Sequence, residues 1–300
     1  MSSGEVMTKK NCDPINTIHG LYTRYRNGSD KPSSVVQNYL EEARRLDPVL
    51  GAYEEIWTDT ALEMASVADK AFKSGSYSSP FCGIPFALKD IFHVKDKVTT
   101  CGSAALVDNF ASQTSTVVAR LLSAGGIILG KTKTVECAFG GWGTNQKMGT
   151  PRNPWDMMKH RIPGGSSSGS AVAVASSMAS CAVGSDTGGS VRLPAAFCGL
   201  VGLKVTADRL PTDGIMPLSQ TLDTPGPITQ TVLDSLIMFD VLDGREGEAI
   251  KRDLDKNEGT YGLLSAGVSG LHIGSLSDEE RQYCSNEVLD SYDMTLDRLC

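Results

Sequence analysis

Apolar residues recur at helical spacing in two stretches near the start of the chain. Because every third or fourth position of a helix faces the same side, this spacing predicts amphipathic helices. Ser33 precedes the first stretch as a capping residue, and Asp59 starts the second. We therefore expect an N-terminal helical layer over about residues 33–75. The apolar positions are Val36, Leu40, Ala43 and Leu46, followed by Leu62, Ala65 and Ala68.

The following stretch alternates short apolar runs with one helical segment. Residues 82–92 (CGIPFALKDIF) predict a buried strand that runs into a turn. Ser115 caps the helical stretch 116–124, which ends at Gly125, and the apolar run 127–130 follows as a strand. Strand, helix and strand in this order form a βαβ unit, which implies a largely parallel sheet with helices on its faces.

The last part of the chain predicts two more helices and one more strand. Thr231 begins a helix over 232–242, and the run 271–276 (LHIGSL) predicts a short strand. Ser277 and Glu280 form a capping box ahead of the last helix. The expected fold is therefore α/β, with a mixed, mostly parallel central sheet covered by helices on both faces.

Composition and charge exclude several classes of protein. Of the 300 residues, 40% are hydrophobic and 21% are charged, and no shift in composition marks a domain boundary. We expect a single domain over residues 1–300 with a catalytic core at about 80–245. The net charge of −7, without a basic stripe, predicts no direct binding to nucleic acid. No apolar run reaches membrane-spanning length and the start lacks a secretory signal, so we expect a cytoplasmic protein without a membrane span.

Cysteine and histidine are scattered through the sequence. No CxxC pair or ligand-like spacing occurs, so we expect free thiols rather than a metal site or disulfides. We predict no metal and no cofactor. The cysteines are Cys12, Cys82, Cys101, Cys137, Cys181, Cys198, Cys284 and Cys300, and the histidines are His19, His93, His160 and His272.

Glycine and serine are concentrated in residues 163–194 (PGGSSSGSAVAVASSMASCAVGSDTGGSVRLP), where alanine and valine interrupt them. A flexible linker would be polar throughout, whereas this stretch carries the apolar run 171–175. Glycine inside a packed region marks places where another group approaches the backbone closely. We therefore interpret the stretch as a catalytic floor built from small residues.

Three short patterns suggest chemistry that their surroundings do not favour. Residues 125–132 (GGIILGKT) match a P-loop, but the variable positions are themselves the predicted strand. Residues 165–169 (GSSSG) match a nucleophile elbow with Ser167 at its centre, but a loop precedes them. A Ser-His-Asp hydrolase that uses His272 stays open. Cys198 lies in an apolar setting without a base, which favours a core cysteine.

The second glycine-rich patch predicts an oxyanion hole. Ser190 follows Gly188 and Gly189 and precedes a short helical stretch. The successive backbone N–H groups of Thr187, Gly188, Gly189 and Ser190 then surround one concavity, which would stabilise negative charge on an attacked carbonyl oxygen. A tight Gly-Gly turn with a capping serine is the alternative if the patch stands alone.

Lys89 is the candidate base for a nucleophilic Ser190. Its apolar neighbours in sequence predict burial, which lowers the pKa of a lysine and lets the neutral amine accept a proton. Ser166, in the first glycine-rich patch, can pass the proton from Ser190 to Lys89. The alternatives are a lysine that extends to solvent or one that pairs with Asp90.

These segments resemble, in this order, the signature of the amidase signature family. The matching segments are 83–90 (GIPFALKD), 164–170 (GGSSSGS) and 184–204 (GSDTGGSVRLPAAFCGLVGLK), and the resemblance also includes 149–154 (GTPRNP) and 222–228 (LDTPGPI). The segment 184–204 is a long and specific match.

The resemblance implies a Ser-cisSer-Lys triad. Lys89 would be the base, Ser166 the bridging serine with a cis peptide bond, and Ser190 the nucleophile. The resemblance also implies that Ser167, Asp186 and Arg192 hold the two glycine-rich patches in register.

The implied function is that of an amidohydrolase, which cleaves a small-molecule carboxylic amide through a seryl acyl-enzyme. One alternative is the glutaminase-type subunit of an aminoacyl-tRNA amidotransferase, which works with partner subunits. Leu193 stands where that subunit class commonly has glutamine, which argues against it. A catalytically silent, truncated paralogue that acts only in assembly is the other alternative, and a homo-oligomer stays open.

Members of the family are considerably longer than this chain. We therefore expect that the C-terminal part of the domain is missing after Cys300, inside what reads as a helix. The predicted strand 271–276 would then be an unprotected sheet edge, and the chain alone would be poorly soluble or oligomeric and weakly active.

Overall fold

The computed structural model describes residues 16–299 and contains two compact units, Met1–Lys256 and Asn257–Cys300. The residues of the predicted Ser-cisSer-Lys site, from Lys89 to Arg192, lie in the first unit, whereas His272 lies in the second. That residues 1–300 form one domain stays a prediction. Among the described residues, no helix is both long enough and apolar enough to cross a membrane.

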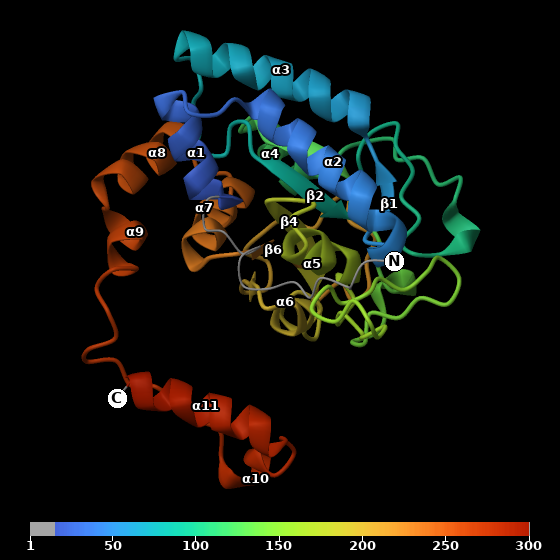
Figure 1. The fold of residues 1–300 in the computed structure, drawn as a ribbon, viewed down its shortest axis with the longest axis vertical. Coiled ribbons are helices and arrows are strands. Elements are labelled where there is room, and N and C mark those ends of the chain that lie inside the picture. The colour runs from blue at the N-terminus through green and yellow to red at the C-terminus, as the bar shows by residue number, and fades with distance from the viewer. Residues whose placement is uncertain (1–15, 300) are drawn as a thin grey trace. The chain divides into compact units, whose positions relative to one another are not determined.

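The predicted N-terminal helical layer is present. Helix α2 begins at Pro32 with Lys31 as the N-cap, so the prediction that Ser33 caps it is wrong. Proline suits the first helical turn because its missing N–H would have no partner there, and Ser33 instead donates to Asp69 of α3 at 2.6 Å. Helices α2 and α3 lie side by side (Figure 1). The helices are α1 (Ile18–Asn27), α2 (Pro32–Leu50) and α3 (Thr58–Ser74).

A six-stranded mixed sheet forms the centre of this unit, in the order β1-β3-β2-β4-β6-β5. Only the three adjacent strands β3, β2 and β4 are parallel to one another, and the outer pairings are antiparallel. The α/β class is confirmed, with the parallel part limited to these three strands. The strands are β1 (Tyr53–Ile56), β2 (Pro85–Lys89), β3 (Ile127–Thr132), β4 (Cys181–Asp186), β5 (Val201–Gly202) and β6 (Thr224–Thr229).

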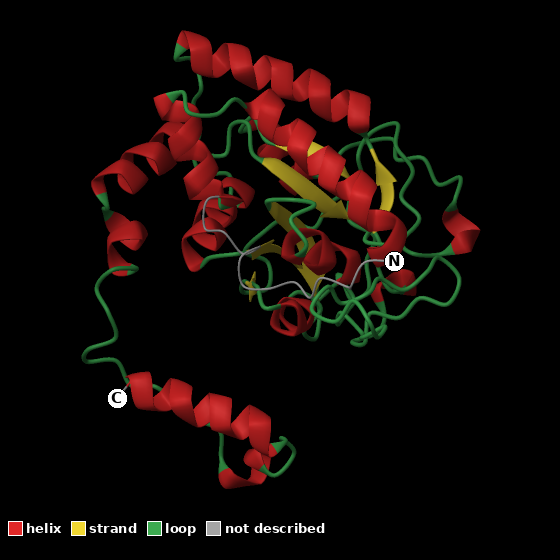
Figure 2. Ribbon diagram, viewed as in Figure 1, coloured by secondary structure: helices red, strands yellow, loops and turns green. Residues whose placement is uncertain are grey.

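Helices α4 and α5 make the crossovers that parallel strands require. Helix α4 (Thr116–Ser123) joins β2 to β3, and Ser115 occupies its N-cap position as predicted, although its side chain makes no capping hydrogen bond. Helix α5 (Ser168–Ala175) joins β3 to β4, and all of its residues are buried because it packs against the sheet. The glycine- and serine-rich stretch is therefore packed and is not a linker. Figure 2 shows the strands of this unit bordered by helices.

Within residues 16–256, the remaining named elements are three α-helices and two short 3-10 helices. Helix α7 begins after Thr231, whose side chain accepts a hydrogen bond from the Asp234 amide, as an N-cap does. The elements are η3 (Ala104–Leu106), η4 (Glu136–Ala138), α6 (Arg192–Cys198), α7 (Val232–Leu242) and α8 (Gly247–Lys256).

The second unit contradicts one prediction and confirms another. Residues 271–276 form no strand and are exposed, because a strand needs a partner for its backbone groups and none of the described strands pairs with this segment. The unprotected edge expected there is therefore absent. The capping box of Ser277 and Glu280 is confirmed. The helices of this unit are α9 (Gly259–Leu263), α10 (Asp278–Arg281) and α11 (Asn286–Leu299).

Candidate active site

Lys89 lies at the end of β2, with its side chain fully buried. Its Nζ donates to Ser166 Oγ at 2.8 Å and to Ser185 Oγ at 2.8 Å. The carboxylate of Asp90 pairs with Lys131 instead, at 2.9 Å. Lys89 therefore neither extends to solvent nor pairs with Asp90, and both alternative interpretations of this lysine are wrong.

The surroundings of Lys89 favour its neutral form. Burial lowers its pKa from 10.5 to about 7, although the nearby Cys101, Asp223 and Asp186 oppose the change. Burial has this effect because a charged ammonium loses its hydration, which neutral hydroxyl partners replace only in part. A large fraction of Lys89 is then neutral near pH 7 and able to accept a proton.

Ser166 follows a cis peptide bond, Gly165–Ser166. Its carbonyl oxygen accepts hydrogen bonds from Thr134 Oγ1 at 2.9 Å and from the Val135 amide at 3.3 Å. Position 165 requires glycine, because a Cβ atom there would lie 2.6 Å from the Gly143 nitrogen. The close approach of these loops thus holds the fully buried Ser166 hydroxyl against Lys89.

Ser190 lies between β4 and α6 and is half-buried. Its carbonyl oxygen accepts a hydrogen bond from the Ser167 amide at 3.2 Å, which joins it to the residue directly after Ser166. No hydrogen bond links Ser190 Oγ to Ser166 Oγ in the described part of the chain. The structure thus brings Lys89 and Ser166 into contact and places Ser190 on the neighbouring backbone.

The backbone before Ser190 supplies N–H groups for an anion. Within residues 16–299, the amides of Thr187, Gly188 and Ser190 donate to no other protein group. The Gly189 amide, also expected in the oxyanion hole, donates to Asp186 Oδ1 at 2.7 Å. Three of the four predicted amides are therefore available to a negatively charged oxygen.

Of the three residues expected to hold the two glycine-rich patches in register, Ser167 bonds across them, whereas the bonds of Asp186 and Arg192 lie within the second patch. Asp186 is buried and accepts hydrogen bonds from the Arg192 guanidinium at 3.0 Å and from the Val191 amide at 3.1 Å. Burial raises the pKa of Asp186, but the bonds from Arg192 and from backbone amides outweigh it and leave the pKa below its usual value. Ser167 Oγ accepts from the Ser185 amide at 3.3 Å, which links the first patch to β4.

Comparison with known proteins identifies the family. The family model described as Amidase matches residues 34–300. The chain belongs to the amidase family. Over 259 residues, it is 38% identical to a glutamyl-tRNA(Gln) amidotransferase subunit of Coxiella burnetii, and the match covers 86% of this chain and 53% of that protein.

Two other relatives carry different names. A 2-amino-5-chloromuconic acid deaminase of Comamonas testosteroni is 41% identical over 241 residues, covering 80% of this chain and 50% of that protein. The solved structure of the peptide amidase from Stenotrophomonas maltophilia superposes with a TM-score of 0.72 at 37% identity, covering 77% of this chain and 49% of that one. The chain spans about half the length of the curated relatives it matches.

Ser185 is a site residue that the sequence did not reveal. It is buried and supplies the second hydroxyl that contacts Lys89. The available signal was its position directly before Asp186 in residues 184–186 (GSD). Because the segment was interpreted for its backbone amides, the side chain of Ser185 received no role.

The three short patterns that suggested other chemistry have structural surroundings in the fold. Lys131 of the P-loop match is buried in β3 and paired with Asp90, so no phosphate-binding loop forms there. Ser167 of the elbow match contacts only backbone through its hydroxyl. Burial raises the pKa of Cys198 to about 12, as in a core cysteine. In the described part of the chain, six cysteines are free and no group of three metal-ligating side chains occurs.

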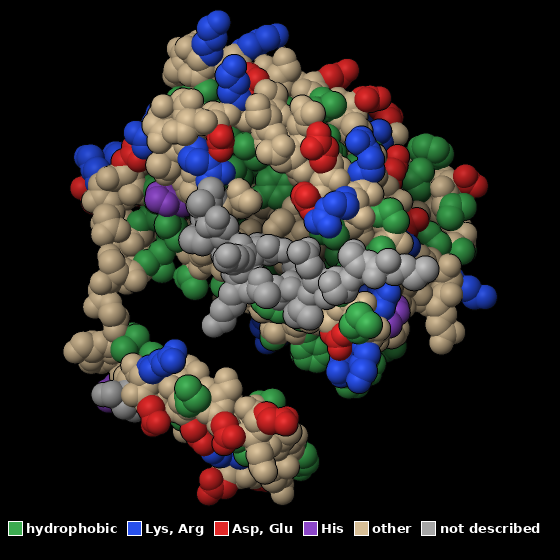
Figure 3. All heavy atoms as spheres, in the orientation of Figure 1, with side chains coloured by type: hydrophobic (Ala, Val, Ile, Leu, Met, Phe, Trp, Pro, Cys, Tyr) green, Lys and Arg blue, Asp and Glu red, His purple; other side chains and the backbone are tan. Residues whose placement is uncertain are grey.

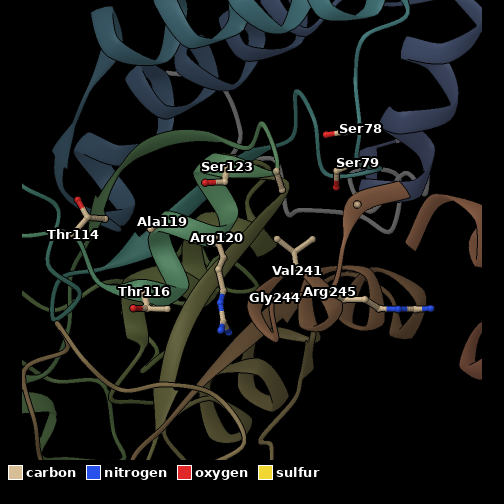
Figure 4. Close-up of a pocket in the computed structure, with 12 residues that line it drawn as sticks. Ser78, Ser79, Thr114, Thr116, Ala119, Arg120, Ser123, Val241, Gly244 and Arg245 are labelled. Atoms are coloured by element: carbon tan, nitrogen blue, oxygen red, sulfur yellow. The ribbon is translucent and has the colours of Figure 1, made fainter. Parts of the chain in front are cut away.

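A pocket of about 360 Å³ lies between α4 and the end of α7, and none of the predicted catalytic residues lines it (Figure 4). Arg120 donates to the Leu242 carbonyl at 2.6 Å, and Arg245 pairs with Asp240 at 2.9 Å and also with Asp253. Both guanidinium groups in this pocket are thus used by the protein itself. On the face drawn in Figure 3, acidic and basic side chains of the first unit are interspersed.

Proposed function

We propose that this chain contains the catalytic core of an amidohydrolase that cleaves a linear carboxylic amide to an acid and ammonia or an amine. The contact of 2.8 Å between Lys89 Nζ and Ser166 Oγ carries the proposal, because it gives a buried lysine with a pKa of about 7 a hydroxyl route toward Ser190. Membership of the amidase family supports hydrolysis of a carbon–nitrogen bond.

In the first half of the reaction, Ser190 Oγ attacks the carbonyl carbon of the amide. Its proton passes to Ser166, whose own proton passes to Lys89, which becomes an ammonium. The carbonyl oxygen becomes an oxyanion, which accepts hydrogen bonds from the backbone amides of Thr187, Gly188 and Ser190. When the carbon–nitrogen bond breaks, Lys89 returns its proton through Ser166 to the leaving nitrogen, and an ester on Ser190 remains.

In the second half, water replaces the amine. The neutral Lys89 accepts a proton from water through Ser166, and the hydroxide oxygen attacks the ester carbon. Collapse of this intermediate releases the carboxylic acid, and the proton returns to Ser190 Oγ. Lys89 thus accepts one proton and returns it in each half of the reaction, so the enzyme ends the cycle unchanged.

A second candidate function is that of a glutaminase-type amidotransferase subunit. The observation in its favour is the 38% identity to the Coxiella burnetii amidotransferase subunit. Leu193, which is exposed beside the site, remains the departure that argues against it. Hydrolysis of free glutamine that rises sharply when partner subunits co-purify would favour this candidate over a self-sufficient amidase.

A fluorophosphonate probe tests the nucleophile. We expect one covalent adduct, located on Ser190 by mass spectrometry of the digested protein, and no adduct in Ser190→Ala. Ser167→Ala serves as the matched control and should still be labelled. An adduct on Ser167 or Cys198 would overturn the assignment, and an intact protein without any adduct would favour the catalytically silent paralogue.

A further inference from the structure

Cys101 and Cys137 lie against each other although 36 positions of sequence separate them. The Cys137 amide donates to the Cys101 carbonyl at 2.8 Å, and the Cys137 thiol is near enough to add to the raised pKa of the Cys101 thiol. A single amide–carbonyl bond of 2.8 Å, together with standard backbone bond lengths, keeps the two Cα atoms within about 7 Å of each other. A disulfide needs Cα atoms about 4.4–6.8 Å apart, so these two cysteines meet its first requirement.

The two thiols differ in their access to solvent. Cys137 is exposed, whereas Cys101 is only 3% exposed. Burial raises the pKa of Cys101 to about 12, so its thiol does not react first with a dissolved oxidant. The arrangement resembles an accessible thiol with a resolving thiol behind it. No hydrogen bond joins any other two of the six cysteines that the structure describes.

The pair also lies between the two segments that support the Lys89–Ser166 contact. The Cys101 amide donates to the carbonyl of Asp90, the residue after Lys89, at 2.9 Å. In the segment of Cys137, the amide of Val135, two residues earlier in the chain, donates a hydrogen bond to the Ser166 carbonyl at 3.3 Å. A bond between the two sulfurs would therefore connect the supports of the base and of the bridging serine.

We propose that Cys101 and Cys137 form a redox-sensitive thiol pair that a peroxide closes to a disulfide. The Cys137 thiolate attacks a peroxide oxygen, and the oxygen–oxygen bond breaks to give a sulfenic acid on Cys137 and hydroxide. The Cys101 sulfur then attacks the Cys137 sulfur, the sulfur–oxygen bond breaks, and water leaves. In balance, two thiols and hydrogen peroxide give one disulfide and two water molecules.

Closure of the pair changes the geometry beside the base. The two sulfur atoms must approach to the bonded distance of about 2.05 Å, which draws the segments of Cys101 and Cys137 together and shifts their bonds to Asp90 and Ser166. We therefore expect oxidation to lower the rate of amide hydrolysis about tenfold or more, and dithiothreitol to restore it. This expectation rests on the proposed function.

The experiment oxidises the full chain with hydrogen peroxide and measures two quantities. Mass spectrometry of the digested protein, without reduction, should show a peptide pair linked through Cys101 and Cys137 with the loss of two hydrogens. Cys137→Ser should lose both the link and the response of hydrolysis to peroxide, while it keeps its activity before oxidation. Cys284→Ser, which changes a partly exposed cysteine of the second unit, should respond like the unaltered chain.

The outcomes separate this inference from the proposed function. Sulfinic acid on Cys137 without a link would overturn the thiol pair, and a link without a change in hydrolysis would overturn its regulatory effect. If the chain hydrolyses no amide, the mass spectrum still decides whether the pair closes, because the link is detected in the native chain without any substrate.

Discussion

Two lysines on neighbouring strands of the central sheet are equally buried but form hydrogen bonds with different kinds of group. Lys89 of β2 and Lys131 of β3 are both buried. In the register of the two strands, Lys131 pairs with Leu88, the residue before Lys89. Burial lowers the pKa of both lysines. Lys89, however, contacts only hydroxyl groups, whereas Lys131 contacts the carboxylate of Asp90.

The difference shows how the partner decides the role of a buried lysine. A hydroxyl carries no charge, so it compensates poorly for the lost hydration of an ammonium, and Lys89 is poised to exchange a proton near pH 7. A carboxylate attracts the ammonium and opposes the fall of its pKa, so the Lys131–Asp90 pair holds β3 to the end of β2. Four changes test this contrast, in order of decreasing effect.

Replacing Lys89 should have the largest effect on catalysis. Lys89→Ala removes the proposed base, and because base catalysis typically contributes ~10²–10⁴-fold to a rate, we expect kcat/KM for an amide substrate to fall by that factor. The measurement is ammonia release at saturating and limiting substrate, with circular dichroism as the check on folding. Near-normal turnover in Lys89→Ala, together with loss of turnover in His272→Ala, would favour a histidine-dependent mechanism.

Replacing Lys131 should have the largest effect on stability. Lys131→Met leaves the buried carboxylate of Asp90 without its cation, which costs about 3–5 kcal/mol in the free energy of unfolding. The double variant Lys131→Met/Asp90→Asn is the control, since it removes both charges and should recover part of the loss. Urea denaturation measures each value. Equal stability of Lys131→Met and the unaltered chain would mean that the pair contributes nothing.

The pH dependence of stability should distinguish a base from an ion pair. The pKa of Lys89 is about 7 in the folded state and 10.5 in an unperturbed lysine, so the unfolded state binds more protons between these values. The free energy of unfolding contributed by this group therefore rises with pH across that window, by up to about 1.4 kcal/mol per pH unit.

Comparison with Lys89→Met isolates this contribution from other titrating groups. From about pH 7.5 to about pH 9.5, the unaltered chain should gain about 2 kcal/mol relative to the variant. Urea midpoints at the two pH values provide the measurement. A difference that stays constant with pH would show that Lys89 keeps an ordinary pKa in the folded state.

Ser185 should have the smallest effect, acting through the pKa of Lys89. An ammonium has three N–H donors and no acceptor, so the Ser185 hydroxyl stabilises the protonated form of Lys89 more than the neutral form. Ser185→Ala should lower that pKa by about one unit or less, since a single hydrogen bond contributes about 0.5–1.5 kcal/mol. The rising limb of kcat/KM then moves to lower pH. Ser185→Thr, which keeps a hydroxyl, should restore its position, and an unmoved limb in Ser185→Ala would exclude this role.

The sequence predicted the elements that depend on local pattern. The βαβ unit from β2 to β3 and the helix after Thr231 are confirmed because hydrophobic spacing and caps act over a few residues. The strand predicted at 271–276 is wrong because pairing depends on a distant partner, which periodicity does not report. The same limit explains why the cap of α2 was placed at Ser33, whose actual partner, Asp69, lies on another helix.

For the candidate site, the sequence by itself determined which chemical groups are available. Lys89, Ser166 and Ser190 were identified from segments whose order and composition match one family, and each lies in the first unit. Only the tertiary structure decided which groups are in contact. The Ser185 hydroxyl accepts a second hydrogen bond from Lys89, and the Gly189 amide donates to Asp186. Lys131 forms an ion pair with Asp90. The physical reason is that burial and hydrogen-bond geometry, which set the pKa of a lysine, arise from strands brought together across the sheet and not from neighbours along the chain.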